Sequence, residues 1–584
     1  MKKLTAGDPE TMSPDMAAAN LERLKALFPE LVTEGPDGVS VNVDVLKSLV
    51  GETVTHADEK YSLHWHGKRQ SRQLALTPST GTLRPCPEDS VDWDATQNLM
   101  IEGDNLEALK LLQKSYSGKV KLIYIDPPYN TGKDFIYPDD FSDSISNYLE
   151  LTNQIESGRR ISSNTESNGR FHTNWLNMLY PRLMLARNLL REDGLIFISI
   201  DDNELAHLTL MCNEIFGESN YVNTIVWHYG KMSNEASKLP NNHEYVLIYR
   251  RSQAGGIFEK VKKEDSEYRN RYIRFVTPEN TVKYGSVRNS SDNLVLLRVK
   301  KIKELLGKEA LDDDDILFDF NKEFKSHSDV IYASTIKGNS DENVKEFDTG
   351  QKPLALMDLL LRFGAPEKDA IVLDFFAGSG STAHALLNYN KEDNGDRRFL
   401  LVQLPEPIQL PGLGSIADIT KKRLRRVGQK IGAENGFLGT DNGFRVFKLD
   451  SSCFRAWDPE TEDLDQTILD FTEHIKEDRT EQDILYELLL KLGLDLCVPI
   501  ERKDIDGKTM HSIGGGVLMA CLAPEITGKD VEPIAQGLVA WHQALVPAGD
   551  TTCVFLDSAF ADDVAKTNLV AILNQHGLTT VRSL

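Results

Sequence analysis

Cysteine is scarce in this sequence, and no two cysteines are spaced as C-x-x-C. Six cysteines among 584 residues, without such a pair, argue against a zinc site and a disulfide framework and fit a reducing compartment. No apolar run reaches the length of about 20 residues that a membrane-spanning helix needs, and the first residues lack the apolar region of a signal peptide. We therefore expect a cytoplasmic protein without a metal site or a membrane segment.

Positive charge is also scarce, because the formal net charge is -23. Phosphate contacts need Lys and Arg, so this total by itself disfavours a nucleic-acid-binding protein. The charge is unevenly distributed, however: residues 226–310 carry 17 Lys and Arg against 10 Asp and Glu, whereas residues 431–584 carry 12 against 26. A basic middle segment is compatible with nucleic-acid binding, although such a stretch is most often a solvated face.

The apolar pattern predicts an α/β protein with several domains. Short apolar runs alternate with helical periodicity in two blocks, which is typical of βαβ units around a mostly parallel sheet. A charged, Asn- and Ser-rich stretch separates the blocks, and a third α/β unit follows them. The predicted segments are 1–95, 96–250, 251–340, 341–430 and 431–584. The predicted strands of the two blocks are 99–101, 122–125, 195–200, 224–229, 244–250, 370–374 and 399–402, of which 224–229 and 244–250 form an antiparallel pair.

The motif Asp126-Pro127-Pro128-Tyr129 follows directly after a predicted buried strand. Ligands of parallel α/β sheets bind at the carboxyl ends of strands, so these residues should face a crevice. Prolines lack N–H donors and leave carbonyls free to accept, so a carboxylate and a carbonyl here suit an amino group with two N–H donors. Tyr129 offers a stacking face for a planar base. The alternative is a turn that merely ends the strand.

A second motif is a Gly-rich turn between a predicted strand and a helix. It reads Asp374-Phe375-Phe376-Ala377-Gly378-Ser379-Gly380-Ser381-Thr382. Glycines let the backbone approach a ligand closely. No Lys precedes Ser381 or Thr382, so this is not a P-loop, and the full dinucleotide pattern is missing. The turn therefore favours S-adenosylmethionine over other adenine-containing ligands.

A third group, Glu102-Gly103-Asp104-Asn105, ends the predicted strand 99–101. An acid at this position can accept a hydrogen bond from an adenine amino group. Asp104 or Asn105 can equally cap the helix that begins near Leu106. Both interpretations stay open, and one residue can serve both purposes.

Taken together, these motifs resemble the amino-group DNA methyltransferases, and their order resembles the circularly permuted β class. Further stretches resemble the modification (Mod) subunits of type III restriction-modification systems, which are DNA adenine-N6 methyltransferases. The stretches that carry this likeness are 82–86, 98–107, 124–132, 175–182, 197–204, 243–247, 401–406 and 483–494. The resemblance is weakest before Tyr61, in the insert that follows Arg250, and after Lys508.

This resemblance implies a circularly permuted Rossmann-like fold with a seven-stranded, mostly parallel sheet. Residues 96–250 and 341–430 would be the two catalytic parts and 251–340 a target-recognition insert, in which Arg269, Asn270, Arg271 and Arg274 are candidates for DNA contact. Residues 1–95 would be an accessory or oligomerisation segment. Residues 431–584 would be a C-terminal α/β domain, with possible partner docking.

The resemblance also implies the site residues. Asp126, Pro127, Pro128 and Tyr129 would hold a flipped adenine of double-stranded DNA. S-adenosylmethionine would lie against the second motif, with further contacts from neighbouring segments. The implied cofactor-binding residues are Asp104, Lys352, Asp374, Phe376, Ala377, Gly378, Ser379, Gly380 and Gln403. Gln403 stands where many methyltransferases have an acid for the ribose, and Glu406 follows, so the ribose contact stays open between the two.

Several alternatives remain for the function. A homodimer and a helicase-nuclease (Res) partner are implied by the family, and this chain lacks the Walker lysine and any evident nuclease cluster. A stand-alone adenine methyltransferase without that partner is one alternative, and a catalytically silent DNA-recognition subunit is another. Methyltransferases acting on RNA or on a protein amide are disfavoured by the motif order.

Overall fold

The computed structural model forms two compact units, Met1–Gly256 with Tyr332–Leu584, and Ile257–Ile331. The residues that it describes are 2–3, 13–27, 32–35, 38–41, 63–131, 171–228, 243–255, 281–288, 295–296, 299–300, 302–303, 308–319, 330–332, 351–435, 439–455 and 475–584. Arg269, Asn270, Arg271 and Arg274 therefore lie outside the described residues.

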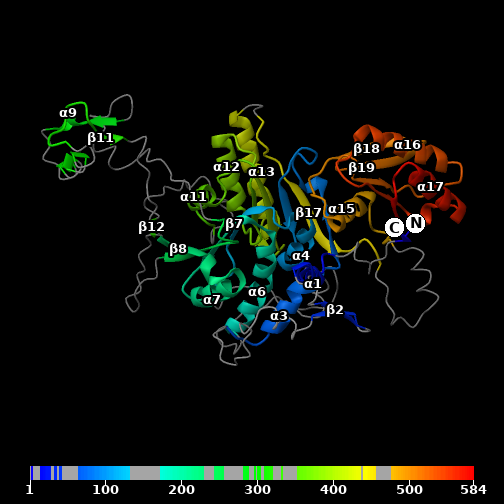
Figure 1. Ribbon diagram of the computed structural model, residues 1–584, viewed down its shortest axis with the longest axis horizontal. Coiled ribbons are helices and arrows are strands. Elements are labelled where there is room, and N and C mark those ends of the chain that lie inside the picture. Colours follow the sequence, from blue (N-terminus) through cyan, green and yellow to red (C-terminus); the bar gives the residue numbers. More distant parts are fainter. Residues whose placement is uncertain are drawn as a thin grey trace. The chain divides into compact units, whose positions relative to one another are not determined.

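The large unit is built on a mixed, mostly parallel sheet (Figure 1). The order of its ten strands is β12-β8-β9-β7-β6-β13-β14-β5-β17-β4. The strands are β4 (Gly81–Pro85), β5 (Leu99–Glu102), β6 (Val120–Ile125), β7 (Leu190–Ile200), β8 (Tyr221–His228), β9 (His243–Arg250), β12 (Val330–Tyr332), β13 (Ile371–Asp374), β14 (Arg398–Gln403) and β17 (Arg445–Ser451). Every residue of β5, β6 and β13 is buried, as expected for strands covered on both faces.

All seven runs predicted as strands are strands of this sheet, and 224–229 and 244–250 pair antiparallel as β8 and β9. The sheet differs from the expected seven strands because β12, β17 and β4 extend it. β17 pairs parallel with β5, and β4 pairs antiparallel with β17. Strands from segments 1–95 and 431–584 thus belong to the large sheet.

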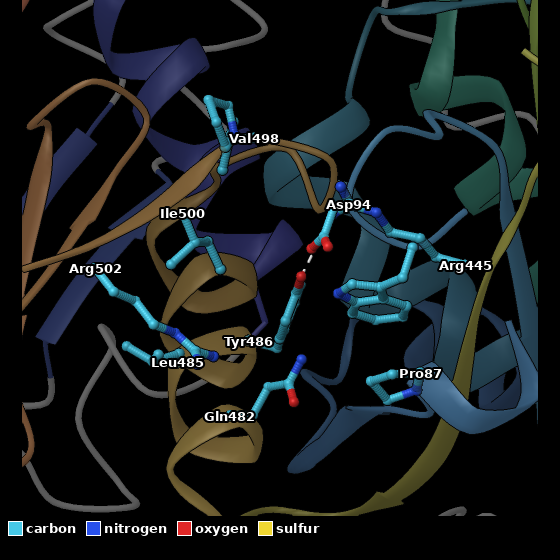
Figure 2. A pocket seen from close by; sticks show the side chains of 11 residues that line it. Pro87, Asp94, Arg445, Gln482, Leu485, Tyr486, Val498, Ile500 and Arg502 are labelled. Carbon is cyan, nitrogen blue, oxygen red and sulfur yellow. Dashed lines mark hydrogen bonds between the residues drawn. The ribbon is translucent and has the colours of Figure 1, made fainter. Parts of the chain in front are cut away.

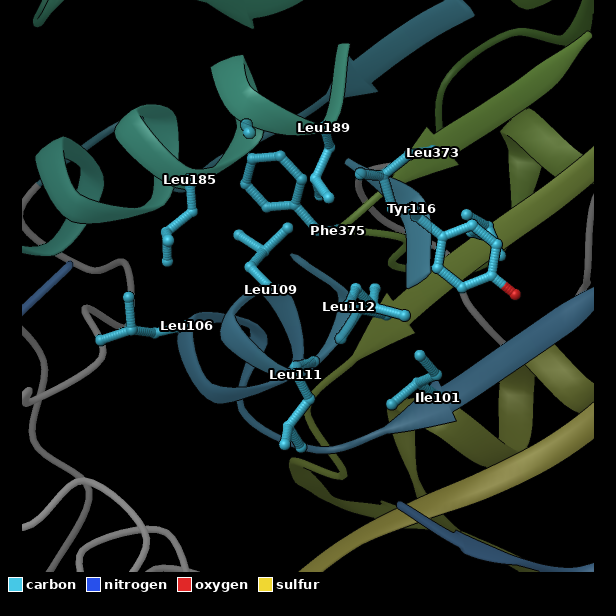
Figure 3. Close-up of a cluster of buried hydrophobic side chains, with 14 of the residues drawn as sticks. Ile101, Leu106, Leu109, Leu111, Leu112, Tyr116, Leu185, Leu189, Leu373 and Phe375 are labelled. Atoms are coloured by element: carbon cyan, nitrogen blue, oxygen red, sulfur yellow. The ribbon is translucent and has the colours of Figure 1, made fainter. Parts of the chain in front are cut away.

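Helices cover both faces of the sheet, with α11 to α13 on one side and α4, α6 and α7 on the other (Figure 1). Their bounds are α4 (Asn105–Tyr116), α6 (Phe171–Leu189), α7 (Leu205–Phe216), α11 (Leu354–Gly364), α12 (Ser381–Asp393) and α13 (Ile416–Asn435). Figure 3 shows leucines of α4 packing against Leu185 and Leu189 of α6 and against Phe375. Phe375 is fully buried, so the Gly-rich turn after β13 is anchored in the hydrophobic core.

Two further helices of the N-terminal part are α1 (Met16–Leu27) and α3 (Lys68–Leu76), of which α3 packs on α6. Two hairpins, β2 (Val32–Gly35) with β3 (Gly38–Val41) and β15 (Pro407–Leu410) with β16 (Leu413–Ser415), form small sheets. Helix α15 (Glu481–Leu492) packs on β4 and α4, and its apolar residues join the main core.

The C-terminal part carries a second sheet of six strands in the order β1-β22-β21-β20-β19-β18. Its members are β1 (Lys2–Lys3), β18 (Ile500–Ile505), β19 (Lys508–Ile513), β20 (Leu518–Cys521), β21 (Thr552–Phe555) and β22 (Thr580–Ser583). Helices α16 (Val531–Leu545) and α17 (Asp563–Gln575) share a separate hydrophobic core with it. Within the predicted segment 431–584, β17 and α15 bury apolar residues in the main core, and so do Ile513, Leu518 and Val554 of the second sheet.

The second unit is small. Strands β10 (Thr281–Lys283) and β11 (Ile316–Asp319) pair antiparallel, and α9 (Tyr284–Val287) follows β10. Val282, Val287, Val295 and Leu311 form its core. Across both units, none of the helices in the described ranges has the length and hydropathy that a bilayer crossing requires.

Candidate active site

The two motifs meet at one edge of the large sheet. Strands β6 and β13 are adjacent and parallel, with Leu122 opposite Val372 and Ile123 opposite Leu373. Asp126 follows β6 and Asp374 ends β13, so both carboxylates lie at the carboxyl ends of neighbouring strands. From this point the chain continues to β7 on one side and to β14 on the other. Such a switch point is where open α/β sheets bind ligands.

The Asp126 loop, residues 126–130, is held by contacts from α6. The Pro128 carbonyl accepts a hydrogen bond from Trp175 Nε1 at 2.7 Å, and the Trp175 side chain is fully buried. Asn130 ends the loop in a left-handed conformation with φ of 60°. Burial raises the pKa of Asp126 above its usual value, although the charge of Lys352 opposes this rise, and the charge of Glu244 adds to it.

Lys352, which was expected to contact the cofactor, lies beside the Asp126 loop. Its Nζ is 3.2 Å from Asp126 Oδ1 and 2.7 Å from Glu244 Oε2. The same Nζ donates to the Tyr129 hydroxyl oxygen at 2.5 Å, and that hydroxyl donates to Glu244 Oε2 at 3.2 Å. Although burial disfavours the charged amine, the two carboxylates hold the pKa of Lys352 above its usual value. The structure thus places two acids around one ammonium.

The Gly-rich turn has the backbone conformation that only glycine adopts readily. Gly378 and Gly380 have φ of 53° and 79°. Gly380 precedes α12, and a Cβ there would approach Thr420 Cγ2 to 3.0 Å. A Cβ on Gly378 would meet no atom closer than 3.9 Å, so the turn borders open space at this residue.

Gln403, at the end of β14, fastens this turn. Its Oε1 accepts from Gly378 N at 2.6 Å, and its Nε2 donates to the Leu404 carbonyl at 3.0 Å. Both polar atoms of the Gln403 amide are therefore used by the backbone. Thr420 on α13 adds a hydrogen bond from its hydroxyl to the Gly378 carbonyl at 2.5 Å.

Asp374 is buried and organises the start of the turn. It accepts from Thr382 Oγ1 at 2.6 Å and from Phe376 N at 3.1 Å. Burial raises the pKa of Asp374 to about 7, against the lowering effect of these two hydrogen bonds. Asp374 thus acts within the protein, between the strand and the first turn of α12.

The sequence matches the model of one protein family and is similar to several known proteins. The family model described as DNA methylase (N6_N4_Mtase) matches residues 120–440. The chain is 32% identical over 557 residues to the Mod subunit of the type III restriction-modification enzyme EcoP15I from Escherichia coli, which covers 82% of this chain and 84% of that protein. The EcoPI Mod subunit of Escherichia phage P1 is also 32% identical, over 563 residues, with the same two coverages.

The chain belongs to the Mod subunits of type III restriction-modification systems. As a member of this family it is a DNA methyltransferase that depends on S-adenosylmethionine. Among solved structures, a complex of M1.HpyAVI with S-adenosylmethionine is 16% identical to it, with a TM-score of 0.31, and covers 56% of this chain and 98% of that one.

In this Mod chain Asp104 is the N-cap of α4, as one of its two sequence-based interpretations predicts. Its Oδ1 accepts from Leu106 N at 2.9 Å and from Glu107 N at 3.2 Å, and its Oδ2 pairs with Arg182 at 3.1 Å. Neighbouring Asn105 donates to the Phe375 carbonyl at 2.7 Å. The start of α4 is thereby tied to the backbone of the Gly-rich turn.

Glu406 lies three residues after Gln403 in a different environment. Within the described part of the chain, its half-buried carboxylate has no hydrogen bond or ion pair. Burial raises its pKa to about 7. A carboxylate in this state, close in sequence to the turn, is available for a ligand hydroxyl.

A cluster that the sequence did not reveal holds Asn130 of the Mod chain. The fully buried Glu204 carboxylate accepts from Asn130 Nδ2 at 2.6 Å and contacts His172 Nδ1 at 2.6 Å and His207 Nδ1 at 2.8 Å. The ligand atoms of His172, Glu204 and His207 lie within 4.8 Å of one another, a spacing that can also hold a metal ion. All three contacts to Glu204 have hydrogen-bond lengths, so the carboxylate is already satisfied.

Replacing Glu204 with alanine should therefore loosen the Asp126 loop. Asn130 Nδ2 would lose its 2.6 Å acceptor and keep the longer contact to the Phe171 carbonyl at 3.3 Å. The free energy of unfolding should therefore fall by about 1–3 kcal/mol, and kcat should fall with it. Chemical denaturation and methylation rates of Glu204→Ala and of the milder Glu204→Gln measure this. A chelator should leave the melting temperature of the wild type unchanged, and a lower melting temperature would favour a metal at this cluster instead.

A separate cavity of about 620 Å³ lies between α15, β17 and the start of β18 (Figure 2). Trp93, Arg445, Tyr486 and Arg502 are among the residues that line it. None of the residues of the two motifs borders this cavity, so it is distinct from the candidate active site.

Proposed function

We propose that this Mod chain transfers a methyl group to the exocyclic N6 of adenine in double-stranded DNA, at one short recognition sequence. The observation that carries the proposal is the pairing of β6 with β13, because it brings the Asp126 loop and the Gly-rich turn to one edge of the sheet. The Asp126 loop suits a planar amino group, and the turn borders open space at Gly378.

The chemistry rests on two acceptors. The nitrogen N6 is a poor nucleophile because its lone pair is delocalised into the ring. Asp126 would accept one N–H, and the Pro127 carbonyl the other, since the Pro128 carbonyl is already used by Trp175. Accepting both hydrogens favours a pyramidal nitrogen whose lone pair is directed at the methyl group. Alignment and electrostatics of this kind each supply several kcal/mol.

S-adenosylmethionine supplies a methyl group already activated by its positive sulfur. Phe376, Ala377, Gly378, Ser379 and Gly380 would line its site through their backbone and the Phe376 ring. Asp374, Gln403 and Asp104 would act indirectly, because their polar atoms hold the turn and α4 in place. Glu406 is the better candidate for the ribose hydroxyls than Gln403, because the Gln403 amide already forms hydrogen bonds with the backbone of Gly378 and Leu404.

The target base must leave the duplex to reach Asp126. Flipping costs about a few kcal/mol, and stacking on the Tyr129 ring would offset part of that. Tyr129 is half-buried, and its hydroxyl contacts with Lys352 and Glu244 fix the ring. The position of Tyr129 therefore suits recognition of a flipped base.

The remaining segments would serve recognition and assembly. The seven strands β5-β14-β13-β6-β7-β9-β8 would form the circularly permuted Rossmann-like methyltransferase sheet, and the insert between β9 and α11 would read the DNA sequence. Residues 1–95 would contribute to a homodimer, and the acidic C-terminal part would dock a helicase-nuclease partner. Both expectations follow from membership of the type III Mod subunits, as does a cytoplasmic location.

Exchanging residues 251–329 for the corresponding segment of another Mod subunit should change the methylated sequence and leave the methylated atom unchanged. The reason is that the Asp126 loop and the Gly-rich turn both belong to the other compact unit. Single-molecule sequencing of plasmid DNA methylated by the chimera measures the outcome. An unchanged recognition sequence would contradict the role proposed for the insert.

The substrate class itself is tested by transfer of a labelled methyl group from S-adenosylmethionine to plasmid DNA, to RNA and to protein. We expect label in double-stranded DNA alone. Transfer to RNA or protein, or no transfer to any of them, would overturn the proposal. Co-expression with a neighbouring helicase-nuclease, followed by purification, separates a restriction complex from a stand-alone methyltransferase.

A further inference from the structure

The Asp126 carboxylate faces a cation. Lys352, just before α11, places Nζ 3.2 Å from Asp126 Oδ1 and 2.7 Å from Glu244 Oε2, and only 13% of its side chain is exposed. Asp126 follows β6 and Glu244 lies on β9, so three elements distant in sequence converge on one ammonium. Gln351, next to Lys352, is held by a hydrogen bond from the buried Arg423, which anchors this segment.

The ammonium of Lys352 lies beside Asp126, where the proposed reaction needs the amino group of the base. An amino group of a base and an ammonium both present N–H groups to a carboxylate. Among the described residues Asp126 Oδ1 is buried without a hydrogen bond, so Lys352 Nζ, 3.2 Å away, neutralises its charge and leaves its lone pairs for the base. Lys352 has a second acceptor at 2.7 Å in Glu244, so it can release Asp126 without becoming an unpaired buried charge.

We propose that Lys352 occupies the place of the substrate amino group beside Asp126 and keeps Asp126 ionised until the base arrives. When the base binds, Lys352 leaves Asp126 and pairs with Glu244 alone. This inference rests on the proposed function, because it takes Asp126 as the acceptor for the substrate. Lys352 and Glu244 are positioning residues in this scheme, since they act on the base through Asp126.

The charges around Asp126 predict how the methylation rate depends on pH. The groups that influence Asp126 are Tyr129 in its own loop, Tyr124 on β6, Glu244 on β9, Asp374 on β13 and Lys352. Of these five groups, Lys352 alone is a cation. Without it, burial and the charge of Glu244 both raise the pKa of Asp126, and a protonated carboxyl group loses an acceptor for the base.

Lys352→Met should therefore move the acidic limb of the pH–rate profile to higher pH. An opposite charge at this distance typically lowers a carboxyl pKa by about 1–3 units, so a shift of about that size is expected. The rate should recover as the pH rises. Equilibrium binding of S-adenosylmethionine to the variant should match the wild type, because Lys352 acts on Asp126 and not on the cofactor.

Glu244→Gln should have the opposite effect on the same limb. Removing the like charge lowers the pKa of Asp126, so the limb should move to lower pH. The maximal rate should fall, because no second carboxylate then draws the ammonium away from Asp126. The double variant Lys352→Met/Glu244→Gln should have its limb below that of Lys352→Met, which a purely structural role for either residue would not produce.

Single-turnover methylation at saturating cofactor and DNA, from acidic to alkaline pH, measures these profiles in the full-length protein. An unmoved limb in Lys352→Met, an upward shift in Glu244→Gln, or a loss of cofactor binding in Lys352→Met would each overturn the inference. If Lys352→Met does not fold, the direction of the shift in Glu244→Gln decides. Methylation by an Asp126→Ala variant would instead overturn the proposed function.

Discussion

Replacing Asp126 with alanine is expected to abolish methylation and to leave the binding of S-adenosylmethionine and DNA largely intact. The variant loses the carboxylate that would accept an N–H of the target amino group, and loss of one such preorganised contact typically costs more than a hundredfold, about 3 kcal/mol. The Gly-rich turn should keep its conformation, because Gln403 and Thr420 hold Gly378 through hydrogen bonds that do not involve Asp126. Labelled methyl transfer, cofactor titration and DNA binding measure the three quantities separately.

Asp201 provides the matched control for this variant. It follows β7 on the same edge of the sheet, and its Oδ1 accepts from Asn203 N at 2.9 Å, as in a local turn. Asp201→Ala should therefore keep most of the methylation activity. Full activity in Asp126→Ala would remove the proposed chemistry, whereas equal losses in both variants would point to a general effect at this edge.

Gly378→Ala should weaken the binding of S-adenosylmethionine by at least about tenfold, which corresponds to about 1.4 kcal/mol. The reason is that a Cβ at Gly378 meets no protein atom closer than 3.9 Å and so enters the space that a bound cofactor would use. Alanine also disfavours the left-handed backbone at Gly378, at a cost of about 1–2 kcal/mol of stability. Isothermal titration with S-adenosylmethionine and a thermal melt distinguish the two effects.

Gly507 is the control for the backbone cost. It has φ of 75° in the turn between β18 and β19, and a Cβ there would meet nothing within 4 Å. Gly507→Ala should lose similar stability and bind the cofactor normally. Normal cofactor binding by Gly378→Ala would show that the cofactor does not approach this face of the turn.

The sequence predicts β5, β6 and β13 because they are continuous apolar runs, as expected for strands buried on both faces. The sequence does not predict β17 and β4, because neither is a continuous apolar run. β17 contains charged residues such as Arg445 and Lys448 among its apolar ones. Both strands lie in segments whose apolar pattern is not that of βαβ units. Their place beside β5 depends on contacts between distant parts of the chain.

The site shows the same division between local pattern and tertiary contact. The order strand, motif, helix suffices to predict that Asp126 and Gly378 share one edge. It does not predict that Lys352 pairs with Asp126 and Glu244, because these three residues meet only when β6, β9 and α11 pack together. Glu204 is hidden for the same reason, since it reaches Asn130 from the loop before α7.

Gln403 illustrates how a departure from a family pattern acquires a physical meaning. An acid is expected at the end of this strand, and the sequence leaves Gln403 and Glu406 as alternatives for the ribose contact. In the structure the amide of Gln403 accepts from Gly378 N and donates to the Leu404 carbonyl. A carboxylate has no N–H to donate, so it would not reproduce both contacts.

The central claim is that adenine N6 receives the methyl group, whereas the family to which the chain belongs contains methylases of both N6 and N4 amino groups. Mass spectrometry of nucleosides from plasmid DNA, incubated with this protein and S-adenosylmethionine carrying a deuterated methyl group, tests that claim most directly. The account predicts deuterated N6-methyladenine as the labelled nucleoside. Label in N4-methylcytosine, or in no nucleoside at all, would contradict it.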